Sequence, residues 1–131
     1  MKARILLATL MLALAACTTT GPRRPAAPAM DYAQYAGPEL DDVFYFRLDS
    51  WEAVSRNELI IWTGMRDAYL LKVWEPCTEL EYAQVIGFTS RFNRLTRFDK
   101  LIAGRDTCPI GSIRKLDTAR LKADRLKARR P

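Results

Sequence analysis

Residues 59–74 read LIIWTGMRDAYLLKVW, and this stretch decides the fold. Its two runs, 59–63 and 68–74, are rich in β-branched and aromatic residues, which favour strands, and a four-residue loop separates them. The stretch therefore predicts a β-hairpin. On its second strand Tyr69, Leu71 and Val73 share one face while Lys72 and Trp74 share the other, and the lysine indicates that this other face is partly wet.

Five more segments carry strand patterns, namely 43–48, 51–54, 80–89, 95–103 and 108–116. The segment 80–89 also fits a short helix, because Leu80, Ala83 and Ile86 would line one side of it. We prefer a strand there, since Gly87 weakens a helix. In the last segment the alternation breaks between Ile110 and Ile113, and a bulge at residues 111–112 would restore it.

These segments predict a mainly β domain over residues 31–117, a small barrel or sandwich of five to seven short antiparallel strands with one disulfide. An α+β fold is the alternative. Without residues 1–16 the chain keeps 115 residues, enough for one small domain. Residues 31–117 hold 11 Lys and Arg against 14 Asp and Glu, so this domain is mildly acidic although the whole chain carries +6.

The C-terminal segment 118–131 is strongly basic, with six Lys and Arg against the single carboxylate of Asp124. Leucine and alanine recur in it at helical spacing, but the segment is too short and too poor in apolar surface to hold a helix alone. It therefore predicts a frayed helix or a disordered tail.

The N-terminal segment 1–16 has the pattern of a signal peptide, with Lys2 and Arg4 followed by an uninterrupted apolar run over residues 5–16. As a helix those twelve residues would reach only roughly 18 Å, short of the ~30 Å hydrocarbon core of a bilayer. The run ends in Leu14-Ala15-Ala16-Cys17, which looks like the lipobox of bacterial lipoproteins. The alternative is ordinary cleavage that leaves Cys17 as a free thiol.

A lipobox implies that Cys17 is acylated, for example with palmitate, and becomes the mature N-terminus of an exported protein. Several acyl chains on one residue make a durable membrane anchor. Residue 18 is threonine and not the aspartate that tends to retain lipoproteins at the inner membrane, so the periplasmic face of the outer membrane is favoured. Residues 17–30 then form the lipidated cysteine and a proline-rich flexible linker.

Cys77 and Cys108 remain once Cys17 carries lipid. An exported domain meets oxidising conditions, which favour a structural disulfide between them. Two free buried thiols or a redox-active pair are the alternatives, although the local Cys-x-x-Cys form is missing.

Several of these segments resemble those of a known protein family. The run FRLDSW at 46–51, Asn57-Glu58, Pro76-Cys77 and Cys108-Pro109-Ile110 resemble a family of small secreted proteins of Gram-negative bacteria that carry a domain of unknown function. The resemblance covers about residues 41–117. It implies a disulfide between the two cysteines and no assigned activity.

Three groups of residues are candidate sites. Trp51, Trp62 and Trp74 could form an aromatic platform for glycan rings or for a partner's side chains, although core packing also explains them. Asp41-Asp42, and Asp49 with Glu52, could supply the carboxylate pair that glycoside hydrolysis needs, although they also read as turn residues. The third group is cationic and forms a possible contact surface for anionic lipid or envelope polymer, with Arg120, Lys122, Arg125, Lys127, Arg129 and Arg130 in the tail.

A further cationic pattern begins in the loop before the predicted strand at 95–103 and continues into that strand. Arg91, Arg94, Arg97 and Lys100 recur every three residues, which would make a basic stripe on a helix, or a solvated loop and strand surface otherwise. We expect no nucleic-acid partner for any of these cations, because the chain is exported.

Composition narrows the chemistry. The chain has no histidine, which removes the commonest metal ligand and the usual general base, and it has no phosphate-binding glycine loop. We expect no metal, no cofactor and no catalysis. The sequence favours a non-enzymatic envelope lipoprotein that binds or scaffolds a periplasmic protein or anionic polymer. An inhibitor or accessory factor of a cell-wall enzyme, and a carboxylate-based hydrolase, are the alternatives.

Overall fold

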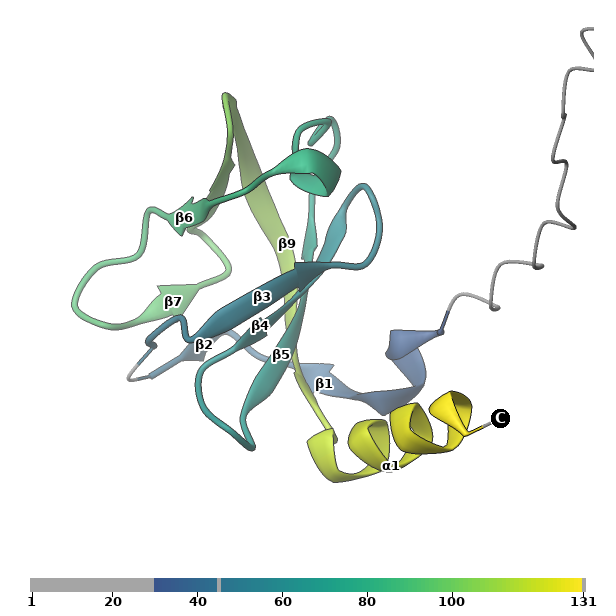
Figure 1. The fold of residues 1–131 in the computed structure, drawn as a ribbon. Helices are drawn as coiled ribbons and strands as arrows, with labels where there is room; N and C mark the ends of the chain where they lie inside the picture. The colour runs from purple at the N-terminus through teal and green to yellow at the C-terminus, as the bar shows by residue number, and fades with distance from the viewer. Residues whose placement is uncertain (1–29, 45, 131) are drawn as a thin grey trace, which may run out of the picture. The chain divides into compact units, whose positions relative to one another are not determined.

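The computed structural model describes residues 30–44 and 46–130, and these form one mainly β unit with one α-helix (Figure 1). The predicted signal peptide, Cys17 and almost all of the linker lie outside the described residues. The elements are, in chain order, η1 (Tyr32–Tyr35), β1 (Ala36–Glu39), β2 (Asp42–Val43), β3 (Ser50–Ala53), β4 (Glu58–Trp62), β5 (Ala68–Val73), η2 (Leu80–Tyr82), β6 (Ile86–Phe88), β7 (Leu95–Thr96), β8 (Lys100–Ala103), β9 (Asp106–Leu116) and α1 (Thr118–Arg129).

The predicted hairpin is confirmed as β4 and β5, which pair antiparallel from Glu58 opposite Lys72 to Trp62 opposite Ala68. The main sheet has the strand order β3-β4-β5-β9-β8-β6, and β1 also pairs with β9. A separate two-stranded ladder joins β2 to β7. Three of the seven pairings link strands that are consecutive along the chain, namely β3–β4, β4–β5 and β8–β9, and the long strand β9 joins β5 to β8.

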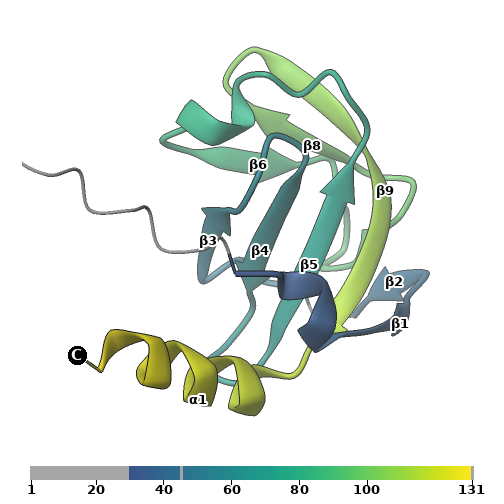
Figure 2. The ribbon, with the colours of Figure 1, turned by 90° about the vertical axis from the view of Figure 1, so that its right-hand side faces the viewer.

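The strand β9 curls the sheet because its two ends pair with different partners (Figure 2). Residues 106–109 pair with β8, while residues 110–115 pair with β5. Lys72 lies opposite Ser112, but Val73 lies opposite Ile110, so Gly111 is an extra residue and the predicted bulge at 111–112 is confirmed. A bulge bends its strand, and here the result is a half-barrel.

The core fills the concave, inner face of this half-barrel. Side chains at every second position of β4, β5 and β9 point into it, as the period of two requires. Residues of β2, β7, β8 and η2 close it from the other side. The buried residues of this core are Val43, Leu59, Ile61, Leu71, Val73, Cys77, Leu80, Ile86, Leu95, Leu101, Ala103, Cys108, Ile110 and Ile113.

The convex, outer face is covered at one end by η1 and α1. The buried residues outside the inner core belong to this face or to those two helices, and they are Tyr35, Ile60, Ala68, Leu70, Leu116, Thr118 and Leu121. The sequence predicted a frayed helix or a disordered tail here, and the structure instead has a helix with a capped start. The Asp117 side chain accepts from Arg120 N, and the Thr118 hydroxyl donates to the Arg66 carbonyl 2.8 Å away.

The mainly β prediction is confirmed, but the strands are more numerous than expected, with nine in the described part of the chain, and β9 is longer than expected. The expected strand at 43–48 keeps only its first residue within β2. The expected strand at 80–89 is η2 followed by the three residues of β6. The expected strand at 95–103 is split into β7 and β8, because the Asp99 carboxylate accepts from Thr96 N at 2.7 Å and closes a turn.

Candidate functional site

A groove of about 570 Å³ lies on the outer face beside the end of β5. A smaller hollow of about 190 Å³ shares Lys72, Ser112 and Arg114 with it, so the two are continuous. We call the two together the outer groove. Its other lining residues are Ala33, Glu39, Asn57, Glu58, Leu70, Val73, Trp74, Glu75 and Gly111.

The strand register explains why charged side chains meet here. Lys72 of β5 lies between Glu58 of β4 and Ser112 of β9, so these three form one cross-strand row. Arg114 lies opposite Glu39 of β1 and so belongs to the same face. Within the described residues, η1 borders these rows at Ala33 but leaves Lys72 and Arg114 exposed.

Trp74 forms one wall of the groove. It follows β5, its side chain is 66% exposed, and its backbone N donates to the Pro109 carbonyl at 2.9 Å. The indole lies against the bulge, since a Cβ on Gly111 would come within 3.3 Å of Trp74 Nε1. A glycine at the bulge therefore lets the indole approach the strand closely, while most of the Trp74 side chain stays exposed.

Charges of both signs line the outer groove. Lys72 and Arg114 supply the cations, and Glu39, Glu58 and Glu75 supply the carboxylates. Within the described residues none of these five forms an ion pair closer than 4.0 Å. These five charged side chains are therefore available to form hydrogen bonds or ion pairs with a ligand.

The three tryptophans do not form one platform. Trp51 lies opposite Ile61 in the register and packs against the inner core, so it faces the other side of the sheet. Trp62 and Trp74 share the outer face, but they lie at opposite ends of β5, roughly 20 Å apart at 3.3 Å per residue. The Lys122 ammonium lies over the Trp62 ring at 5.4 Å. Only Trp74 stands open beside a groove.

The tail cations divide into two sets. Arg120 lies over the Tyr35 ring at 5.4 Å, Lys122 donates to the Met65 carbonyl, and Arg125 pairs with Glu52. These three dock α1 on the domain and do not form a free basic surface. The cations exposed near the end of the helix are Lys127, Arg129 and Arg130.

The candidate carboxylates are separated into individual ion pairs. Asp41 pairs with Arg97, Asp42 with Arg94, Asp49 with Arg47, and Glu52 with Arg125. No two of these four carboxylates line a common pocket in the part of the chain that the structure describes. Their arrangement matches surface pairing and gives no acid and base flanking a shared cleft.

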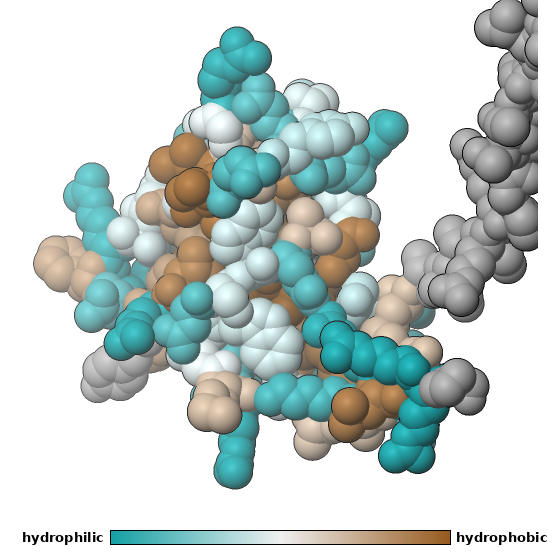
Figure 3. Space-filling model, viewed as in Figure 1, coloured by the Kyte–Doolittle hydropathy of each residue, from teal (hydrophilic) through white to brown (hydrophobic). Residues whose placement is uncertain are grey.

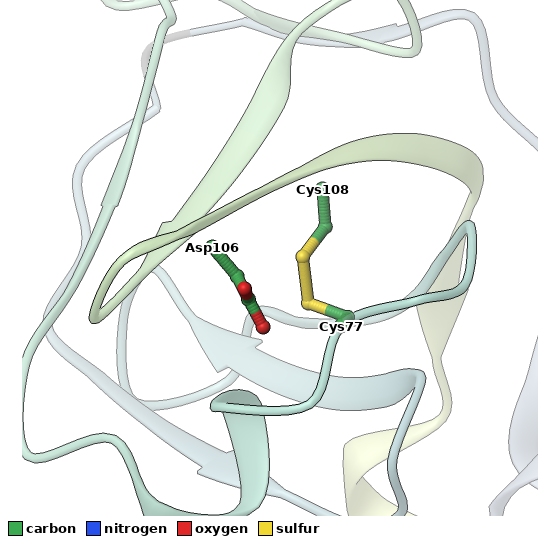
Figure 4. Close-up of side chains that lie close together, drawn as sticks. All are labelled: Cys77, Asp106 and Cys108. Atoms are coloured by element: carbon green, nitrogen blue, oxygen red, sulfur yellow. A yellow bond between two sulfur atoms is a disulfide. The ribbon is translucent and has the colours of Figure 1, made fainter.

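The predicted disulfide between Cys77 and Cys108 is present, with the Cα atoms 5.8 Å apart (Figure 4). Asp106 lies beside it, but its carboxylate is already engaged, accepting from Glu79 N at 2.9 Å and from the Thr78 hydroxyl at 3.0 Å. These hydrogen bonds lower the pKa of Asp106. With the two sulfurs bonded to each other, this cluster pins the loop before η2 to β9.

Sequence reasoning missed most of the outer groove. It recognised the partly wet face from Lys72 and the bulge at 111–112, but it assigned no role to Arg114, Glu39 or Glu58. The alternation in β9 would place Arg114 beside Lys72, but only once the pairing of β5 with β9 is known. That pairing joins residues about 40 positions apart and leaves no local signal.

Comparison with known proteins finds one family model, described as a family of unknown function (DUF6491), that matches residues 1–131. Neither a curated protein nor a solved structure matches the chain. Among the described residues, no helix has the length and apolar character needed to cross a bilayer.

Proposed function

The chain belongs to DUF6491, a family of unknown function, and we propose that it is an exported, lipid-anchored, non-enzymatic module that binds a glycan of the cell envelope in its outer groove. The observation that carries the proposal is the exposed indole of Trp74 above a bulge glycine, beside charged groups of both signs that form no ion pairs with each other.

The chemistry of the outer groove supports a sugar ligand. An aromatic face buries the apolar C–H face of a sugar ring, and a few placed polar groups then fix its orientation. Lys72 and Arg114 donate to hydroxyl or carboxylate oxygens, and Glu39, Glu58 and Glu75 accept from hydroxyl groups. A purely anionic polymer fits less well, because the three carboxylates would repel it.

A non-enzymatic role is supported by what the carboxylates and the composition offer. Glycoside hydrolysis needs two carboxylates about 5 to 9 Å apart on either side of one bond. The four candidates from the sequence each bind a different arginine. With no histidine in the chain, the usual base for nucleophilic catalysis is missing as well.

The cellular location in this proposal rests on the sequence. The apolar run at 5–16 and the Leu-Ala-Ala-Cys sequence at 14–17 support export and acylation of Cys17, with the outer membrane favoured. The disulfide agrees with an oxidising compartment. Labelled palmitate should enter the native chain and not a Cys17→Ser variant.

The test is binding of the full chain to insoluble cell-wall sacculi by sedimentation, and to soluble glycan fragments by calorimetry. Trp74→Ala should weaken binding about tenfold or more, because a stacked aromatic face contributes roughly 1 to 2 kcal/mol. Arg114→Gln should weaken it as well. Tyr82→Ala is the matched control, since Tyr82 is also exposed but lies outside the groove.

Three outcomes would count against the proposal. Equal binding by the Trp74→Ala and Tyr82→Ala variants would remove the groove from the function. Release of soluble sugar by the chain alone would favour the hydrolase. Inhibition of a cell-wall enzyme without any binding of glycan by the chain would favour the inhibitor.

A further inference from the structure

The turn between β6 and β7 presents a phenylalanine in an unusual way. Arg94 N donates to the Arg91 carbonyl at 3.1 Å, which closes a two-residue turn over Phe92 and Asn93. Both central residues have φ near +54°, a left-handed conformation that favours glycine and asparagine and disfavours a bulky aromatic. Phe92 is nonetheless 98% exposed, so no contact within the domain accounts for it.

This turn is held firmly by the structure behind it. Phe46 N donates to the Asn93 carbonyl at 2.6 Å, and the β2–β7 ladder places Val43 opposite Leu95. Val43 and Leu95 are buried in the inner core, so the alternate residues of the ladder point outward. The domain therefore projects Phe92 from a fixed support.

Two further aromatic rings are exposed on the same support. Phe44 is 63% exposed beneath the Arg94 guanidinium, and Phe98 is 82% exposed beneath that of Arg97. We call Phe44, Arg91, Phe92, Arg94, Arg97 and Phe98 together the aromatic tip. In Figure 3 apolar and hydrophilic side chains protrude together at the left edge, where β2 and β7 lie in Figure 1.

The arginines of the aromatic tip can bind anions. Residues 90–98 contain three arginines and no carboxylate. Arg97 pairs with Asp41, and this pair is solvent-exposed, so it is weak. Arg94 donates from Nε and Nη2 to Asp42, whose side chain is only 21% exposed, so this arginine is already engaged. Arg91 forms no ion pair with the described residues. Phosphate groups could therefore bind the guanidinium groups of Arg91 and Arg97.

We propose that the aromatic tip docks on the surface of an anionic phospholipid bilayer. Phe92, with Phe44 and Phe98 beside it, enters the boundary between headgroups and acyl chains, and Arg91 and Arg97 bind lipid phosphates. Exposed aromatic rings next to cations match the chemistry of that boundary. A protein partner would instead need a concave surface that covers the rings, and it is the rival outcome of the test.

The test uses the full chain reconstituted in vesicles made of equal parts phosphatidylcholine and phosphatidylglycerol. An environment-sensitive fluorophore is attached to the introduced cysteine of a Phe98→Cys variant. Cys77 and Cys108 do not react with it because they are joined in their disulfide, and Cys17 does not because it is acylated in the proposed anchor. The matched control carries the fluorophore on Met65→Cys, an exposed position in the β4–β5 loop. The readout is quenching by spin labels on the lipid. We expect several-fold stronger quenching at position 98 than at position 65, and less of it without phosphatidylglycerol.

Adding Phe92→Asn to the Phe98→Cys variant should reduce the docked population roughly tenfold, because one apolar side chain no longer leaves water. Asparagine is favoured at positive φ, so this variant keeps the turn, and an unchanged unfolding midpoint will show that it is folded. Equal quenching at positions 98 and 65 would overturn the proposal. The proposal would also be overturned if Phe92→Asn left the quenching at position 98 unchanged. The same holds if a cross-linker at position 98 captured a protein from native envelopes and no lipid.

Discussion

The Tyr35 hydroxyl donates a hydrogen bond to the Asp124 carboxylate over 2.8 Å, and so joins η1 to α1 across 89 residues of chain. The Arg120 guanidinium lies over the same ring. The start and the end of the folded unit are therefore fixed to each other, and α1 is part of the domain.

This contact should make the docking of α1 sensitive to alkaline pH. The hydrogen bond to Asp124, together with burial and the negative charge of that carboxylate, raises the pKa of Tyr35 above its usual 10.0. Because the pKa in the folded state lies above that of the unfolded chain, the contribution to stability is fully present below about pH 10 and falls as the pH rises through the folded-state value.

The measurement is the thermal unfolding midpoint of the native chain and of Tyr35→Phe between neutral pH and pH 11. The difference between the two midpoints should shrink above about pH 10. Lys115, whose pKa is raised mainly by its hydrogen bond to Asp67, titrates in the same range but contributes equally to both proteins. A difference that stays constant across the range would show that this phenol does not hold the helix.

Leu121 should account for much of the stability that α1 adds. It is fully buried, whereas Leu126 of the same helix is largely exposed. Leu121→Ala should lower the free energy of unfolding by about 2 to 4 kcal/mol, because it removes buried methyl groups and leaves a cavity. Leu126→Ala should change it by less than about 0.5 kcal/mol. Urea unfolding of both variants provides the measurement, and equal losses would contradict the packing of α1 on the domain.

Local pattern was enough to predict the β4–β5 hairpin and the bulge in β9, because neighbouring residues set both. It was not enough for α1. Its burial depends on Tyr35 and on the Arg66 carbonyl, which lie about 90 and 50 residues away along the chain. The composition of 118–131 alone indicated a tail, since a solvated basic segment and a docked basic helix have the same composition.

The candidate site shows the same limit. Whether a tryptophan faces the core or solvent depends on strand register. A shift of one residue would turn Trp51 toward the outer face and Glu52 toward the core. The sequence could therefore name the three tryptophans but not select Trp74. The position of Arg114 likewise depends on the pairing of β9 with β5 and β1. By contrast, the sequence was enough to predict the disulfide, because only Cys77 and Cys108 remain once Cys17 is set aside as the predicted lipidation site.

The disulfide should be the largest single contribution to stability in the described domain. It closes a loop between cysteines 31 residues apart that contains η2, β6, β7 and β8. Constraining a loop of this length in the unfolded chain contributes about 3 to 4 kcal/mol. The double variant Cys77→Ala with Cys108→Ala should lose about that much in urea unfolding, and the native chain in excess dithiothreitol should match it. The double variant leaves no unpaired thiol in the described domain. If the oxidised and reduced native chains unfold at the same urea concentration, the bridge does not stabilise this fold, and the hydrogen bonds of Asp106 and Glu79 are enough to hold the loop before η2.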